Sequence, residues 1–222
     1  MHVELKEKNI NLLVDFDSTF VTVETIDEIS KLSCERESAE KIKKITIKAM
    51  EGKISFQEAL SNRVKIINAN KNHVKQIKAL LKKKISPTFS LNKKFIINNA
   101  DNFYIISGGF KEIIFDIVKD FGIKEKNVFA NDFIYDKNSN IININTNNPL
   151  SKNRGKVLVS ETIKGYNIAI GDGFTDFEIK KFNKAKKFIQ YTETINRKNI
   201  NNHADFIAKN FNEAISYINS LF

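Results

Sequence analysis

Two acidic residues that directly follow a run of apolar residues are the first sign of chemistry in this chain. The run Ile10 to Val14 leads into the pentad DFDST, which places Asp15 and Asp17 two residues apart. Alternate residues of an extended segment point to the same side, so these carboxylates would repel each other unless a cation or a shared proton lay between them. Mg²⁺ suits such a pair because it binds a few carboxylates and keeps several of its waters. The pentad therefore indicates a site for Mg²⁺ and phosphate chemistry.

Two further motifs also follow predicted strands. They are SGGF at Ser107 and GDGFTD at Gly171, and the second supplies more carboxylate oxygens from Asp172 and Asp176. Open α/β folds bind their ligands at the carboxyl ends of parallel strands, so the three loops should meet at one edge of a sheet. Each motif alone has an ordinary explanation, because Asp often caps a helix and DG often forms a turn. Together, and in this order, they favour a single catalytic site.

The spacing of apolar residues predicts the elements that position these motifs. Ile10 to Phe16 is a continuous apolar run, typical of a strand buried inside a parallel sheet. Four helices are expected after it, over Thr25 to Ser33, Arg36 to Glu51, Ser55 to Asn68 and Lys71 to Lys84. They would form a small helical bundle.

Beyond Pro87, strands alternate with helices. We expect helices over Leu91 to Ala100, over Lys111 to Phe121, from Gly155 and after Asp176. Strands are expected over Phe103 to Ile106, Val128 to Ala130 and Asn167 to Ile170. A hairpin is expected over Phe133 to Ile144, with its turn near Asn138. Such alternation predicts parallel strands with right-handed crossovers. The expected fold is α/β. It has a Rossmann-like parallel sheet core formed by residues 1–23 and 86–222, an inserted helical-bundle cap of residues 24–85, and a small β-hairpin insert.

Composition limits the class of protein. The 222 residues are 41% hydrophobic and 28% charged, which is typical of a soluble globular chain with one core, or a core and a smaller insert. Charges fall where a signal peptide needs its apolar centre, and no apolar run approaches the length of a bilayer, so a cytoplasmic protein without a membrane partner is expected. Cys34 is the only cysteine, which excludes an internal disulfide and a thiolate metal cluster.

The net charge of +10 could indicate a nucleic-acid partner. The lysines are spread along helical stretches, however, which is typical of solvated helix faces, so we expect no nucleic acid and only an attraction for small phosphorylated anions. The histidines His2, His73 and His203 occur singly, without the spacing of a zinc site. The sequence leaves the oligomeric state open.

The chain resembles the haloacid dehalogenase (HAD) superfamily of phosphohydrolases and, within it, the phosphoserine phosphatase family. The resemblance covers nearly the whole length. It includes DFDST, SGGF and GDGFTD, and also the stretches VETIDEIS at Val23 and AMEGKISFQEALSNRV at Ala49. It implies a HAD-like core and a Mg²⁺-dependent phosphatase that hydrolyses O-phosphoserine to serine and phosphate.

The resemblance also implies roles for the aspartates. Asp15 matches the nucleophile that forms an aspartyl phosphate. Asp17 matches the general acid that protonates the departing serine oxygen and later acts as base on water. Mg²⁺ would be held by Asp15, the backbone carbonyl of Asp17 and Asp172, while Asp176 orients a metal-bound water.

Small residues complete the expected phosphate site. Ser107, Gly108 and Gly109 would bind the phosphoryl group, and glycine would let the main chain approach its oxygens closely. Thr19 and Thr175 are expected to orient the aspartates, with Thr175 also close to the substrate, although either could serve only as a helix cap.

The family has a lysine just before a glycine at the start of a helix, and this chain departs from that pattern. Arg154 precedes Gly155. Arginine keeps the charge and binds phosphate well, but its planar fork is longer and differently shaped. Lys152 or Lys156 could reach in instead, with Arg154 as a solvated loop residue. Arg154 and Lys156 are therefore both candidates.

Specificity for phosphoserine would depend on the helical insert, because this substrate carries an ammonium and a carboxylate beside its phosphate. Glu24 and Arg63 are the family's candidates for binding these two groups. Arg63 follows Phe56 by seven residues, which places both on one helix face about 10 Å apart. A guanidinium in that apolar face needs an anion. Met50 and Phe56 would exclude water from the site. Alternatively, Arg63 pairs with Glu24 or another cap carboxylate only to stabilise the bundle, and Met50 and Phe56 are core residues.

Three other functions stay open at this point. The chain could be a HAD phosphatase or phosphotransferase for another small phosphomonoester such as phosphohomoserine. It could be a phosphate-binding pseudoenzyme, as the substitution at Arg154 suggests. It could also be a receiver-type domain phosphorylated on Asp15, although that function would not explain the helical insert.

Overall fold

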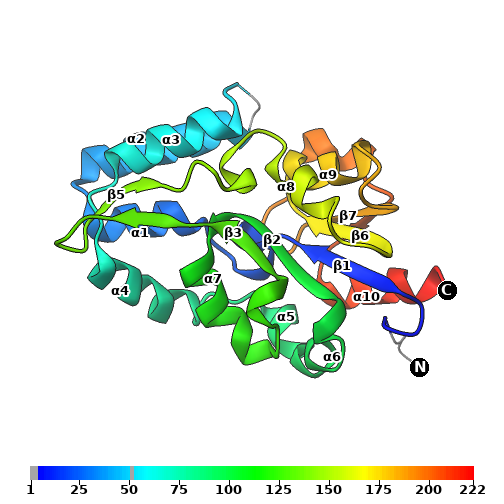
Figure 1. Ribbon diagram of the computed structural model, residues 1–222. Coiled ribbons are helices and arrows are strands. Elements are labelled where there is room, and N and C mark those ends of the chain that lie inside the picture. The colour runs from blue at the N-terminus through cyan, green and yellow to red at the C-terminus, as the bar shows by residue number, and fades with distance from the viewer. Residues whose placement is uncertain (1–4, 51–52) are drawn as a thin grey trace.

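The computed structural model describes residues 5–50 and 53–222, and Met50 by its backbone only. Six parallel strands form a sheet covered by helices on both faces, and a two-stranded antiparallel sheet lies beside it (Figure 1). The large sheet has the order β3-β2-β1-β6-β7-β8 and consists of β1 (Ile10–Val14), β2 (Phe103–Phe110), β3 (Val128–Asn131), β6 (Tyr166–Gly171), β7 (Lys187–Tyr191) and β8 (Phe206–Ala208). The predicted α/β class is confirmed.

Strand β1 lies in the middle of this sheet, between β2 and β6. All five of its residues are buried, which explains its continuous apolar sequence. From β1 the chain order runs toward β3 on one side and toward β8 on the other, so the strand order reverses beside β1. Ligands of open α/β sheets bind at such a reversal.

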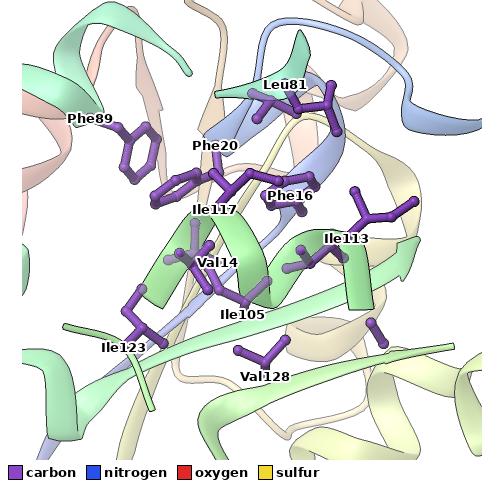
Figure 2. Packing of buried hydrophobic residues seen from close by; sticks show 14 of the residues in the cluster. Val14, Phe16, Phe20, Leu81, Phe89, Ile105, Ile113, Ile117, Ile123 and Val128 are labelled. Carbon is purple, nitrogen blue, oxygen red and sulfur yellow. The ribbon is translucent and has the colours of Figure 1, made fainter. Parts of the chain in front are cut away.

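Both faces of the sheet carry an apolar core. On one face, Val14, Ile105 and Val128 pack beneath α7 (Lys111–Val118), which contributes Ile113 and Ile117 (Figure 2). Successive side chains of a strand point to opposite faces, so the neighbours of these residues fill a second core. That core lies under α8 (Gly155–Ser160) and α9 (Phe174–Lys181). The sheet is thereby fixed from both sides.

The helical block lies between β1 and β2 in the sequence and extends to one side of the sheet (Figure 1). It consists of α1 (Thr25–Ser33), α2 (Arg36–Met50), α3 (Phe56–Ile66) and α4 (Lys71–Leu81). The Ser55 side chain accepts a bond from the Glu58 amide and so starts α3. Val21 and Ile85 pair where the chain leaves and re-enters the core. The division into a core of 1–23 and 86–222 and a cap of 24–85 stays a prediction.

The predicted hairpin is confirmed. Strands β4 (Phe133–Tyr135) and β5 (Ile141–Ile144) are antiparallel, and the Asp136 carboxylate accepts the amides of Asn138 and Asn140 in the turn between them. The hairpin also contacts the helical block, because the Lys71 amide donates to the Ser139 carbonyl at 3.1 Å. It therefore joins the block to the core.

The structure corrects several predicted boundaries. The single helix expected over Leu91 to Ala100 is two short helices, α5 (Pro87–Leu91) and α6 (Lys93–Asn98), because Asn92 between them leaves helical geometry. Strand β2 does not end at Ile106 but continues through SGGF with a shift in register. Helix α9 begins at Phe174, ahead of Asp176.

The region after α9, for which the sequence predicts no element, contains β7, β8 and α10 (Phe211–Ser220). Helix α10 packs on the same face of the sheet as α7. Within residues 5–50 and 53–222, no helix combines the length and the apolar character of a membrane span.

Candidate active site

Three buried carboxylates meet at the carboxyl edge of the sheet. Asp15, Asp172 and Asp176 each place an oxygen within 4.8 Å of the other two. Asp15 directly follows β1, Asp172 directly follows β6, and Asp176 lies in the first turn of α9. The first and third motifs therefore come together as their positions after strands predict.

A close approach of main chain and side chain holds Asp176 in this cluster. A Cβ on Gly171 would lie 2.2 Å from Asp176 Cγ, so only glycine fits at the end of β6. Asp176 Oδ2 also accepts the Gly173 amide at 3.1 Å. The first of these contacts explains the glycine that opens GDGFTD.

Lys156 is the cation that faces the aspartates. Its Nζ lies 2.7 Å from Asp15 Oδ1 and 2.7 Å from Asp176 Oδ1, and the residue is only 8% exposed. Burial alone would lower the pKa of Lys156, but the two carboxylates outweigh it and hold the pKa above its ordinary value. Lys156 is therefore a fixed positive charge beside Asp15.

Arg154 lies elsewhere in the same region. Its side chain is exposed, and its guanidinium lies over the ring of Phe182 at 4.5 Å from the centroid. It lines the mouth of the cavity described below, together with Lys152. Of the two candidates for the cationic position, the structure brings Lys156 to Asp15 and leaves Arg154 at the rim.

The chemistry of the cluster fits a divalent cation. Burial, reinforced by the charge of Asp15, raises the pKa of Asp172 and of Asp176 to about 7. The donors are all carboxylate oxygens, which suit a hard ion such as Mg²⁺ better than Zn²⁺. Thr19 reaches the same group, with its hydroxyl 3.5 Å from Asp172 Oδ1.

Asp17 lies outside this cluster. Its carboxylate accepts the amide of Thr25 at 3.1 Å and also its hydroxyl, at the start of α1. Burial raises the pKa of Asp17 well above its ordinary value, and the charges of Glu24 and Asp15 raise it further. The side chain is thereby disposed to carry a proton, whereas metal binding by its backbone carbonyl stays a prediction.

The SGGF segment lies beneath the helical block. Ser107 Oγ accepts the Gly109 amide at 2.9 Å, and the Asn131 side chain donates to the Gly108 carbonyl at 2.9 Å. A Cβ on Gly108 would come within 2.5 Å of Phe56 Cζ. The first residue of α3 therefore packs directly on the end of β2.

Glu24 and Arg63 lie where the helical block meets the core. Glu24 Oε1 accepts the Ser18 hydroxyl at 2.8 Å. Arg63 is 6% exposed, and its Nε donates to the Ala59 carbonyl at 3.2 Å. Burial lowers the pKa of Arg63, whereas the charge of Glu24 raises it. Within the part of the chain that the structure describes, no carboxylate forms an ion pair with this guanidinium.

One cavity of about 560 Å³ joins these groups. Among the predicted site residues whose side chains the structure describes, every one lines it except Thr19. Thr19 lies behind Asp172, and the Met50 side chain is outside the described residues. Phe56 and Thr175 line the cavity as expected, and Phe56 is half-buried there.

Arg197 is a residue of the site that sequence reasoning missed. Its Nε donates to Asp172 Oδ2 at 2.7 Å, and its Nη2 lies 3.6 Å from Glu24 Oε1. It therefore links the aspartate cluster to Glu24. One signal was available, because only four of the 36 basic residues are arginines, and Arg63, Arg154 and Arg197 are three of the four.

Comparisons with known proteins agree with this geometry, although no family model matches the chain. The chloroplastic phosphoserine phosphatase of Arabidopsis thaliana is 32% identical over 93% of this chain and 70% of its own length. The phosphoserine phosphatase of Methanocaldococcus jannaschii is 33% identical over 82% of this chain and 84% of its own length.

Solved structures show the same similarity. A phosphoserine phosphohydrolase-like protein from Francisella tularensis superposes with a TM-score of 0.83 at 27% identity, over 94% of this chain and 99% of that one. A phospho-aspartyl intermediate analogue of phosphoserine phosphatase superposes with a TM-score of 0.76 at 27% identity, over 95% and 98%. The sequence likeness to curated relatives, together with the shared fold, establishes that this chain belongs to the phosphoserine phosphatase family of the HAD superfamily.

Proposed function

We propose that this protein hydrolyses O-phosphoserine to serine and inorganic phosphate, with Mg²⁺ and through an aspartyl phosphate on Asp15. Its phosphatase class follows from the family. A structure described as a substrate-bound phosphoserine phosphatase complex, with a TM-score of 0.76 at 27% identity, supports the choice of substrate.

One observation carries this proposal. Arg63 is a buried guanidinium without an ion pair among the described residues, and it lines the same cavity as Asp15 and Glu24. A buried charge is costly unless an anion compensates it. The carboxylate of phosphoserine would compensate Arg63, its ammonium would pair with Glu24, and its phosphate would reach Asp15.

The nucleophile is held by its neighbours. Asp15 Oδ1 accepts the Phe16 amide at 2.8 Å and pairs with Lys156, which leaves Oδ2 to attack phosphorus. As the Oδ2–P bond forms, the bond between phosphorus and the serine oxygen breaks, and Asp17 gives its proton to that oxygen. Asp17 then takes a proton from water, which attacks phosphorus and releases phosphate and the free Asp15 carboxylate.

The remaining groups balance charge. Lys156, Ser107 and the Gly108 amide would face the phosphoryl oxygens. Asp15 and Asp172, with Asp176 beside them, would hold Mg²⁺, which when bound screens the nucleophile from the negative phosphoryl group. Thr19 and Thr175 would keep the aspartates in place.

Phosphate release from O-phosphoserine by the purified protein tests this function. We expect turnover that requires Mg²⁺ and is abolished in Asp15→Asn. Glu24→Gln and Arg63→Ala should each lower kcat/KM by roughly 10²-fold, the cost of leaving a charged substrate group unpaired. A substrate panel that includes phosphohomoserine separates other phosphomonoesters. Unaltered phosphoserine turnover in both variants would contradict the assignment of the substrate, and no turnover of any phosphomonoester with Mg²⁺ would indicate a binding protein.

A further inference from the structure

Three helices of the helical block meet at one buried hydroxyl. Arg63 Nη1 of α3 lies 3.2 Å from Thr46 Oγ1 of α2, and that hydroxyl lies 2.7 Å from Asp27 Oδ1 of α1. Thr46 is 4% exposed, and its hydroxyl is also 3.2 Å from the Ile42 carbonyl. Neither Thr46 nor Asp27 lines the cavity, so neither is placed to touch a substrate.

The direction of these hydrogen bonds is fixed by chemistry. A guanidinium can only donate, an ionised carboxylate can only accept, and a hydroxyl has a single proton. The Thr46 hydroxyl must therefore accept from Arg63, and its shortest contact shows that it donates to Asp27. The chain of donors runs from Arg63 through Thr46 to Asp27 and cannot be reversed.

This series of hydrogen bonds restrains the guanidinium without occupying its other N–H groups. The Arg63 Nε is held by the Ala59 carbonyl and its Nη1 by Thr46, so two of its five N–H groups define the plane of the fork. Asp27 places a negative charge one hydroxyl away from the guanidinium but does not pair with it directly. A direct ion pair between Asp27 and Arg63 would instead compete with a substrate carboxylate for the same N–H groups.

We propose that Thr46 and Asp27 are positioning residues that hold Arg63 ready for the substrate carboxylate and so set the KM for a phosphorylated amino acid. The proposal rests on the function proposed above, because it requires a substrate with a carboxylate. Ligands that carry phosphate but no carboxylate should be indifferent to these two residues.

The matched variants Thr46→Val and Thr46→Ser test this role. Valine keeps the volume but removes the hydroxyl, which frees the guanidinium and leaves Asp27 without its donor. We expect Thr46→Val to raise the KM for O-phosphoserine about tenfold while kcat stays within about twofold, and Thr46→Ser to restore the KM. The inhibition constants of O-phosphoethanolamine and inorganic phosphate, measured as competitors in the same assay, should not change.

Each result decides the matter. An unchanged KM in Thr46→Val, or an equal rise in KM and in both inhibition constants, would overturn the positioning role while leaving the proposed function intact. Wild-type protein that fails to hydrolyse O-phosphoserine would overturn the proposed function and the positioning role with it. If thermal unfolding shows that Thr46→Val does not fold, Asp27→Asn serves instead. That variant keeps an acceptor for Thr46 but loses the charge, so the KM should rise by less than tenfold, again without a change for the two competitors.

Discussion

Two basic residues, two positions apart, have different surroundings in this protein. Arg154 has a φ of 59° and lies just before helix α8, whereas Lys156 is inside the helix. Side chains of a helix lean toward its N-terminus, so a residue in the first turn of α8 can reach the strand ends. The sequence points to Arg154 by its place before glycine, but only the three-dimensional course of this turn shows which side chain faces Asp15.

Matched substitutions at these positions should therefore differ in effect. Lys156→Met removes the cation that faces Asp15 and Asp176, so we expect kcat for phosphoserine to fall by about 10³-fold, as is typical when a charge at the reacting group is lost. Arg154→Met removes a contact with Phe182 at the rim and should change kcat by less than about threefold. Steady-state phosphate release measures both. Equal losses in the two variants would show that Arg154 also acts on the phosphoryl group.

The predictability of the site depends on how each residue is placed. Asp15 and Asp172 could be predicted together because both directly follow buried strands, and neighbouring strands of a sheet end at one edge. Arg197 precedes a short helical segment between β7 and β8 and belongs to no recognisable motif. Its contacts with Asp172 and Glu24 depend on long-range packing that local spacing does not encode.

At the scale of elements, α3 is the helix of the helical block that packs on the site. Phe56 lies against Gly108, the Gln57 amide donates to Asn153 Oδ1 at 3.2 Å, and Arg63 points into the cavity from the same helix. The helix therefore lines the cavity and also carries Arg63, the residue proposed to bind the substrate carboxylate. A change in its docking should alter turnover even where no substrate contact is lost.

A double-mutant cycle between Gly108 and Phe56 tests this docking. Gly108→Ala should force the ring and α3 outward and lower kcat/KM for phosphoserine by at least about tenfold. Phe56→Ala removes the ring that lines the cavity and also removes the clash between that ring and the methyl group added at position 108. We expect Phe56→Ala to cost less in the Gly108→Ala background than in the wild type, by roughly 0.5–3 kcal/mol of coupling. Losses that simply add would indicate that the two residues do not act through a shared contact.

The elements themselves were predictable to different degrees. Helix α1 has the predicted bounds, and its buried residues Ile26 and Ile29 keep the i, i+3 spacing of an amphipathic helix. Helix α10 buries Phe211, Ala214, Ile215 and Ile218. This spacing is visible in the sequence and predicts an amphipathic helix there. Strand β8 has three residues, too few for any periodicity, and its place is set by pairing with β7.

At the scale of the molecule, the helical block contacts the rest of the chain at several places. Lys82 at the end of α4 lies 3.3 Å from Asp116 of α7, and the hairpin pairs with the segment before α4. Figure 1 shows the hairpin extending from the sheet to the helical block, where α2 and α3 lie above it in this view. The cavity is thus enclosed by segments from most of the chain, which explains why no single stretch of sequence could define it.

The enclosed cavity concentrates negative charge. Asp15, Asp172 and Asp176 face Lys156 and Arg197, so three carboxylates meet two cations when all are ionised. The pKa of Asp172 and of Asp176 is about 7 in the folded protein, well above the value of about 4 in an unfolded chain. The folded state therefore holds these protons more tightly than the unfolded state. The resulting stability is complete below about pH 4 and is lost as the pH rises through about 7.

Mg²⁺ should reverse this loss of stability at higher pH, because the ion and the protons compete for the same carboxylate oxygens. We expect the rise in Tm that Mg²⁺ causes, relative to protein in EDTA, to be small near about pH 5.5 and several degrees larger near about pH 8. Thermal unfolding across this pH range measures it, with Asp172→Asn as the control that should lose most of the shift. A shift that is constant with pH would mean that the carboxylates are already ionised without metal, beside Lys156 and Arg197. A shift that is larger at the acidic end would contradict competition between the ion and the protons.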